Sequence, residues 1–173
     1  MSKVRVLPGA ASLVALLAAA PAAAQGALES YAGRWVGTAI AVEAGSWPVI
    51  DAGDFVVTIS GGRRSFEASW SAVVPVDGGA RWDRASTEFE RAARPGYYQP
   101  DDGADLFEGD PQYWAFAGEG ELILGRLQID EDSGGPLMYV CHLVPSETGM
   151  EAMLVLTAAG AETARARVTL VRP

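Results

Sequence analysis

The chain has one cysteine and one histidine, and the two are neighbours, Cys141 and His142. A thiol beside an imidazole acts as a nucleophile when the two side chains can exchange a proton. The surrounding residues have the composition of a β-strand, however, and neighbouring side chains of a strand point to opposite faces. We therefore expect Cys141 to be a buried, inert side chain. A single cysteine forms no disulfide within the chain, and a single histidine disfavours a zinc site.

The run Asp132-Ser133-Gly134-Gly135 resembles the loop that carries the nucleophilic serine of chymotrypsin-like proteases. In those enzymes the histidine base and the orienting aspartate precede the serine in the chain. Here the only histidine follows it. The same run has the composition of a hairpin turn, which is the interpretation we favour.

Carboxylates that could act together occur in three places. Glu88 and Glu90 share one face of an expected strand, as the acid and base of a sugar hydrolase would. The runs 101–110 and 130–132 are rich in the oxygen ligands that calcium takes, but neither has the ordered spacing of a calcium loop. A solvated acidic surface explains all three. We predict no catalytic residues, no metal site and no cofactor, and we favour a binding protein over an enzyme.

Large aromatic side chains are spread along the whole chain. The five tryptophans are Trp35, Trp47, Trp70, Trp82 and Trp114. A closed sheet would bring several of them together, either to fill its interior or to line a site for a small apolar ligand. Alternation on the expected strands gives four candidate lining residues: Phe66, Trp70, Trp114 and Tyr139.

Alternating or β-branched apolar segments recur along the chain, separated by clusters of Gly, Pro and Asp. They predict strands over 34–43, 54–60, 65–75, 80–92, 113–118, 121–130, 136–144, 150–157 and 162–172. The segment 84–94 has a second interpretation, a short helix that Asp83 caps and Pro95 ends. Because tight turns join consecutive strands, the predicted fold is all-β, a single antiparallel up-and-down β-barrel of about eight to nine strands.

The segment 95–111 is the longest connection between expected strands. It contains three prolines, two tyrosines and five carboxylates. Long connections in compact domains are often lids or binding loops. Two interpretations stay open: Tyr97–Asp110 is a lid over the interior, or the segment is a solvated excursion.

The N-terminus has the three parts of a secretory signal. Lys3 and Arg5 are followed by an uncharged apolar run over 10–20, and then by Pro21 and the small residues Ala22-Ala23-Ala24. This pattern predicts a signal peptide over 1–24, with cleavage near Ala24/Gln25. The expected location is periplasmic or secreted, and the expected domain is a barrel over 25–173. The apolar run is too short for a transmembrane helix, and we predict none.

The chain is acidic. Its 13 Lys and Arg residues against 22 Asp and Glu residues give a formal net charge of −9. Such a chain is repelled by phosphate backbones, so nucleic-acid binding is disfavoured.

The triplet Gly33-Arg34-Trp35 opens the first expected strand shortly after the signal peptide. It resembles the Gly-x-Trp signature of the lipocalins and the wider calycin group of up-and-down barrels. The whole pattern is also similar to exported bacterial proteins of about this size. The resemblance implies that Gly33 and Trp35 close one end of the barrel, with an arginine from the last strand packed over the tryptophan. The candidates are Arg165, Arg167 and Arg172. The alternative is that Trp35 is an ordinary core residue.

Three functions stay open. The first is a carrier that binds or sequesters a small hydrophobic ligand, with small residues such as Gly37 and Ala68 leaving room beside the aromatics. The second is a periplasmic protein-binding module, an inhibitor or envelope accessory protein with a packed barrel and no ligand; its partner is unknown. The third is an outer-membrane barrel, which the ending Leu170-Val171-Arg172-Pro173 disfavours because such chains usually end on an aromatic residue.

Overall fold

The computed structural model describes residues 28–45, 52–62, 64–76, 79–101, 113–129 and 134–173. The predicted signal peptide, Trp47, Ser133, both acidic runs apart from Asp101, and most of the predicted lid lie outside these residues. The side chains of 72–83, including Trp82, are also outside the description.

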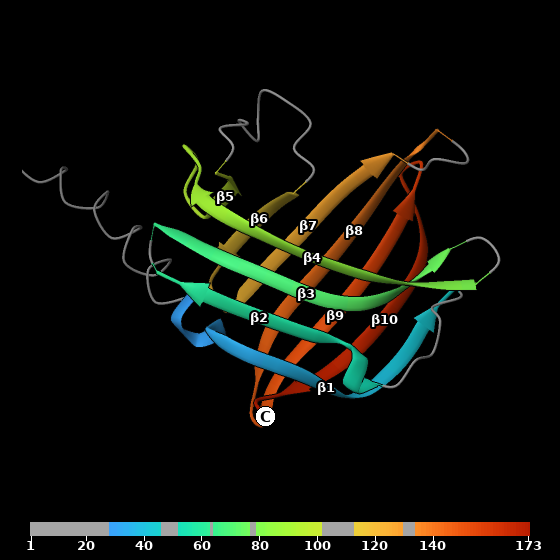
Figure 1. Ribbon diagram of the computed structural model, residues 1–173, viewed down its shortest axis with the longest axis horizontal. Helices are drawn as coiled ribbons and strands as arrows, with labels where there is room; N and C mark the ends of the chain where they lie inside the picture. The colour runs from blue at the N-terminus through green and yellow to red at the C-terminus, as the bar shows by residue number, and fades with distance from the viewer. Residues whose placement is uncertain (1–27, 46–51, 63, 77–78, 102–112, 130–133) are drawn as a thin grey trace, which may run out of the picture.

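Ten strands form one sheet (Figure 1). They are β1 (Gly33–Ala44), β2 (Val56–Gly61), β3 (Ser65–Val76), β4 (Gly79–Arg91), β5 (Tyr97–Pro100), β6 (Tyr113–Gly118), β7 (Glu121–Ile129), β8 (Pro136–Ser146), β9 (Gly149–Ala158) and β10 (Ala161–Val171). Each strand pairs antiparallel with the next one in the chain, and β1 pairs with β10, which closes the ring. The prediction of an all-β, antiparallel up-and-down barrel is confirmed.

The alternation of the sequence decides which side chains enter the barrel. On β9, Met150, Ala152, Leu154 and Leu156 are buried, whereas the residues between them are partly exposed. Because side chains of a strand alternate between its two faces, the buried set marks the interior. Cross-strand pairs on the neighbouring strands extend it around the ring, and one apolar core results.

The strand that the sequence did not predict is β5. It has four residues, ends on Pro100 shortly after Pro95, and falls in the segment expected to be a loop. Proline lacks a backbone N–H, and so short a segment shows no readable alternation. Tyr98 nevertheless pairs with Ala115 and is 5% exposed, so this short strand belongs to the wall. Residues 84–91 form the second half of β4, not the alternative helix.

The two ends of the barrel differ. We call the end where β1 begins the covered end, because a helical turn over 28–31 packs there, beside the start of β1 (Figure 1). Leu28 and Tyr31 of this turn belong to the buried core. We call the opposite end, where β7 and β9 finish, the far end.

Glycine makes a close backbone approach possible on β1. A Cβ atom at Gly37 would lie 2.2 Å from the carbonyl oxygen of Ala52, in the 3-10 helix η1 (Ala52–Asp54). Instead, the Gly37 N–H donates a hydrogen bond to the carbonyl of Phe55 at 2.9 Å. Gly37 therefore lets η1 pack against β1 at the point where β1 stops pairing with β2.

The outer surface has a polar side and an apolar side. On β3 and β4, Glu67 lies opposite Glu88, and Ser86 donates a hydrogen bond to the Glu67 carboxylate at 2.5 Å. On β6–β9 the outward residues form what we call the apolar outer face. It consists of Trp114, Phe116, Ile123, Leu127, Met138, Val140, Met153 and Val155.

Candidate functional site

The predicted closure residue Trp35 lies at the covered end and is 5% exposed. Its indole N–H donates a hydrogen bond to the carbonyl of Tyr31, at 2.8 Å. That carbonyl belongs to the helical turn, where the last C=O groups have no partner within so short a helix. The tryptophan therefore ties the turn to the first strand. Gly33, the other predicted closure residue, has a φ of 120°, a conformation that favours glycine.

Of the three candidate arginines, Arg172 lies over Trp35. Its guanidinium carbon is 4.6 Å from the centroid of the tryptophan ring, within the range of a cation–π contact. The same guanidinium donates to the carbonyl of Ala32 at 3.1 Å. The other two point outward. Arg165 pairs with Glu162, and Arg167 pairs with both Glu43 and Glu151. Arg172 thus joins the end of the chain to the start of the barrel.

The four predicted lining residues do not lie together. Phe66 is 2% exposed and packs against Phe89 and Tyr98, with ring centroids 5.0 and 5.1 Å away. It therefore belongs to the packed core. Trp114 is on the face of β6 opposite to the buried Ala115.

Trp114 covers the outer side of Gly125, its direct partner on β7. A Cβ atom at Gly125 would lie 2.0 Å from the indole ring, so only glycine leaves room for the ring there. The prediction that Trp114 points inward is wrong. Its neighbour Tyr113 points inward instead, so the predicted alternation of this strand is shifted by one residue. Both faces of β6 are apolar, so the alternation of the sequence could not decide between the two.

Trp70 and Tyr139 do point inward, toward the far end. Together with Tyr113 they are partly buried and pack against the core. The rings of Trp70 and Tyr113 meet edge to face, with centroids 5.7 Å apart, across the interior from β3 to β6. In a closed barrel, inward side chains that stay partly exposed border space that solvent reaches.

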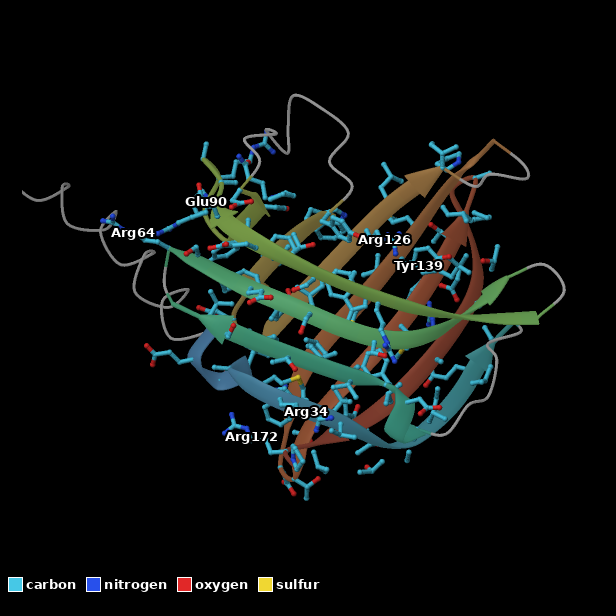
Figure 2. The ribbon with its side chains drawn as sticks, in the orientation of Figure 1. Arg34, Arg64, Glu90, Arg126, Tyr139 and Arg172 are labelled. Carbon is cyan, nitrogen blue, oxygen red and sulfur yellow. The ribbon has the colours of Figure 1, made fainter. Side chains whose placement is uncertain are left out.

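Arg126 joins this group, although it is not among the residues that the sequence predicted. On β7 it follows the buried Leu122 and Leu124 on the inward face. Its backbone is paired with Tyr113 on one side and with Tyr139 on the other. Arg126 and Tyr139 are labelled in Figure 2. The guanidinium carbon lies 5.6 Å from the centroid of the Tyr113 ring. The alternation Leu122, Leu124, Arg126 was the signal that could have found it.

Cys141 and His142 lie on opposite faces of β8. The Cys141 thiol is inward, and burial raises its pKa to about 12. Because the thiolate is the nucleophile, this thiol is unreactive at neutral pH. The His142 imidazole is on the outside, 2.8 Å from the Glu121 carboxylate. Cys141 and His142 therefore do not act together as a nucleophile and its base.

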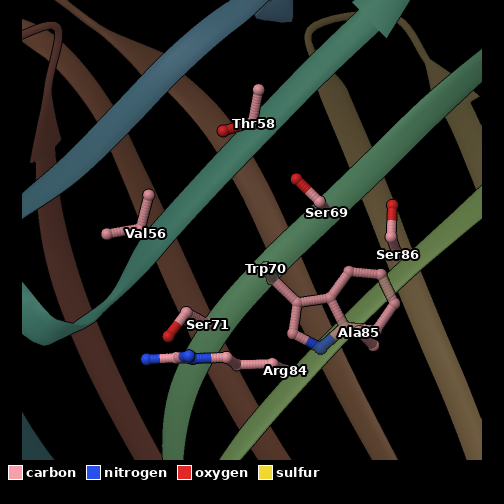
Figure 3. Close-up of a pocket in the computed structure, with 8 residues that line it drawn as sticks. All are labelled: Val56, Thr58, Ser69, Trp70, Ser71, Arg84, Ala85 and Ser86. Carbon is pink, nitrogen blue, oxygen red and sulfur yellow. The ribbon is translucent and has the colours of Figure 1, made fainter.

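A shallow hollow of about 360 Å³ lies on the polar outer side, across β2, β3 and β4 (Figure 3). Its lining residues are Val56, Thr58, Ser69, Trp70, Ser71, Arg84, Ala85 and Ser86. Hydroxyls dominate the outward positions. The hollow is more open than enclosed, so it does not surround a ligand.

Among the described side chains, no group of three or more His, Cys, Asp or Glu residues could hold a metal ion. In the same part of the chain, no helix is both long and apolar enough to cross a membrane. Comparison of the chain with protein-family models, with curated proteins and with solved structures finds no match.

Proposed function

We propose that the chain is an exported, lipocalin-like barrel that carries or sequesters a small hydrophobic ligand in the far half of its interior. One observation carries the proposal: Trp70, Tyr113 and Tyr139 point inward but are only partly buried. Elsewhere in the interior, large side chains such as Phe89, Leu122 and Leu143 have no exposed area. Aromatic walls around accessible space are typical of sites for small apolar molecules.

The contacts of Trp35 support the lipocalin-like part of the proposal. A Gly-x-Trp triplet at the start of β1 resembles the lipocalin signature, and Arg172 of the chain's C-terminal end packs on the tryptophan ring at 4.6 Å. In a barrel covered at one end in this way, a ligand would enter from the far end. The predicted signal peptide would take the protein to the periplasm or outside the cell.

The test is native mass spectrometry of the protein purified from the periplasm, followed by titration with extracted lipids and small aromatics. We expect a co-purified small molecule, or saturable quenching of tryptophan fluorescence. Trp70→Ala should weaken the binding. Trp114→Ala is the matched control, because it removes a tryptophan from the outer face and should leave binding unchanged. Equal effects of both substitutions, or no saturable quenching, would count against the carrier.

A second candidate function is a protein-binding module with no ligand, which the apolar outer face favours. Its partly exposed side chains, among them Ile123, Val140 and Met153, cover adjacent strands. Contiguous apolar surface of this kind marks interaction sites in many proteins. This candidate predicts that one protein partner co-purifies with the chain in a fixed stoichiometry. Val140→Glu should abolish the binding of that partner. Ser69→Glu, the matched change on the polar side, should leave the binding unchanged.

A further inference from the structure

We infer that a second copy of this chain covers the apolar outer face, and that a two-fold axis parallel to the strands relates the two copies. The inference concerns the outside of the barrel and does not depend on the proposed carrier function. Contiguous apolar side chains on an outer surface mark an interaction site, and their order across the strands indicates which partner fits. The strands involved, from β6 to β10, lie side by side in the ring (Figure 1).

The outward side chains of these five strands form cross-strand rows. The first row has an aromatic ring at one edge and a guanidinium at the other. Its members, from β6 to β10, are Trp114, Gly125, Val140, Val155 and Arg165. Ala115, Leu154 and Ala166 are adjacent in sequence to members of this row, and all three are buried. Because side chains of a strand alternate between its faces, the row itself faces outward.

The next row toward the covered end repeats this order. Its members are Phe116, Ile123, His142, Met153 and Arg167. His142 is the polar exception at the centre, and its imidazole lies 2.8 Å from the Glu121 carboxylate of its own chain. Both rows therefore run from an aromatic edge on β6, across mostly aliphatic side chains, to a cationic edge on β10.

A two-fold axis that is parallel to the strands and centred on β8 matches this order with its own reverse. It places β6 of one copy opposite β10 of the other, β7 opposite β9, and β8 opposite β8. Trp114 of each copy then faces Arg165 of the other. Phe116 faces Arg167 in the same way. A guanidinium is attracted to the face of an aromatic ring, and the symmetry repeats each of these contacts, so the face is complementary to itself.

The two arginines keep their present ion pairs in this arrangement. Arg165 lies 2.6 Å from Glu162, and Arg167 lies 2.9 and 3.2 Å from its two carboxylate partners. These pairs use the N–H edge of the guanidinium, whereas stacking on an aromatic ring uses its flat side. The contact with the second copy is therefore added to the ion pairs and does not replace them.

The lengths of the side chains suit two curved sheets. The outside of a closed ring curves away from a flat contact, so the edges of the interface need longer side chains than the middle. Val140 lies at the middle of its row, whereas tryptophan, phenylalanine and arginine side chains lie at the edges. This gradation lets both edges meet while the centres of the two faces pack directly.

The size of the face predicts the strength of the dimer. The face extends beyond these two rows to Leu127 and Met138 in the next row toward the far end. With strands about 4.8 Å apart and successive outward residues about 6.8 Å apart, three rows on five strands cover roughly 500 Å² per copy. About 1,000 Å² over both copies is the lower limit for a specific interface. We therefore expect a dissociation constant in the micromolar range.

Sedimentation velocity of the purified protein, over a concentration series that spans the micromolar range, tests the inference. We expect a reversible equilibrium between monomer and dimer. Val140→Glu places two carboxylates opposite each other at the axis, so it should raise the dissociation constant at least about a hundredfold. Ser69→Glu, the matched change on the polar side, should leave it unchanged. A protein that stays monomeric throughout the series, or a dimer that Val140→Glu leaves intact, would overturn the inference.

A double-mutant cycle tests the position of the axis. Within one copy, Trp114 and Arg165 lie at opposite edges of their row, about 19 Å apart along the sheet, and cannot touch. Trp114→Ala and Arg165→Ala should each weaken the dimer by about tenfold. Because both remove the same contact, the double variant should be weakened by clearly less than the product of the two effects. Arg84→Ala removes an equal charge from the polar side and should have no effect.

The remaining outcomes separate this inference from the proposed functions. Independent effects in the cycle would overturn the inferred axis, and a monomer that binds a different protein through this face would overturn the second copy and support the protein-binding module. Circular dichroism checks that each variant folds. If Trp114→Ala does not fold, the cycle of Phe116→Ala and Arg167→Ala tests the second row in the same way. None of these results concerns the interior, so the carrier depends only on its own test.

Discussion

The covered half and the far half of the interior are built by the same strands but packed differently. At the covered end Tyr31, Phe89 and Leu170 have no exposed area. At the far end Trp70, Tyr113 and Tyr139 remain partly exposed, and a cation is placed among them. Close packing stabilises the fold, whereas accessible aromatic surface offers contacts to a bound molecule. One sheet can therefore separate stability and binding along its length.

Replacing one tryptophan in each half with alanine should give the largest difference between the two halves. Trp35→Ala removes a buried ring, its hydrogen bond to Tyr31 and the ring that supports Arg172, so we expect a loss of about 3–5 kcal/mol. Trp70→Ala should cost clearly less, because part of its ring already contacts solvent. Urea unfolding followed by circular dichroism measures both. Equal losses would show that the far half is packed as tightly as the covered half.

Alkaline pH probes two groups of the interior, the Cys141 thiol and the Tyr31 phenol. Burial raises the pKa of the Cys141 thiol to about 12, and burial, with a smaller effect of the Glu121 charge, raises the pKa of Tyr31 to about 12. In the unfolded chain these groups ionise near their ordinary values, 9.0 for the thiol and 10.0 for the phenol. Between those values and 12 the unfolded state holds fewer protons, so stability falls as pH rises.

The slope is at most about 1.4 kcal/mol per pH unit for each group. Unfolding by urea at a series of pH values from 8 upward should show the loss beginning near pH 9. In Cys141→Ala it should begin about one unit later, near the ordinary pKa of tyrosine. A flat profile to pH 12 would mean that neither group is shielded from water.

Removing the guanidinium that lies on Trp35 should have a smaller effect. Arg172→Ala loses a cation–π contact and the hydrogen bond to Ala32, together worth about 1–2 kcal/mol. Arg165→Ala breaks only the exposed pair with Glu162, so it should lower the free energy of unfolding by at most a few tenths of a kcal/mol. Thermal unfolding of the two variants side by side tests whether the last strand contributes to closure. A midpoint that Arg172→Ala leaves unchanged would argue against it.

The smallest expected effect has the opposite sign. The Tyr31 hydroxyl is buried and has no hydrogen-bond partner among the described residues. An unsatisfied buried hydroxyl costs about 1–3 kcal/mol, so Tyr31→Phe should leave stability unchanged or raise it by about 1 kcal/mol. Because the phenol is also removed, the alkaline loss from this group should disappear. A marked destabilisation would indicate that a bound water satisfies the hydroxyl.

Much of the fold is readable from alternation, and the errors have physical causes. The segment expected over 113–118 coincides with β6, since polar residues, Gly and Pro bound it in the sequence on both sides. The inward face of that strand could not be read, because aromatic and small residues alternate there and both are apolar. Arg126 was readable from its spacing after Leu122 and Leu124, but a charge in a strand is normally taken as solvent-facing. The contact of Arg172 with Trp35 depends on how the ring closes, which no local pattern specifies.

The closure of the ring has a consequence for how the protein is made. The hydrogen bond between Arg172 and Ala32 joins residues 140 positions apart, and β1 needs β10 as its partner over most of its length. Contacts between distant parts of a chain form slowly, because the intervening chain must be ordered first. During synthesis β10 is also the last strand to become available. Until then β1 and β9 each have an unpaired edge, where another chain could add a strand. The chain is therefore most prone to aggregation while β10 has not yet paired with β1 and β9.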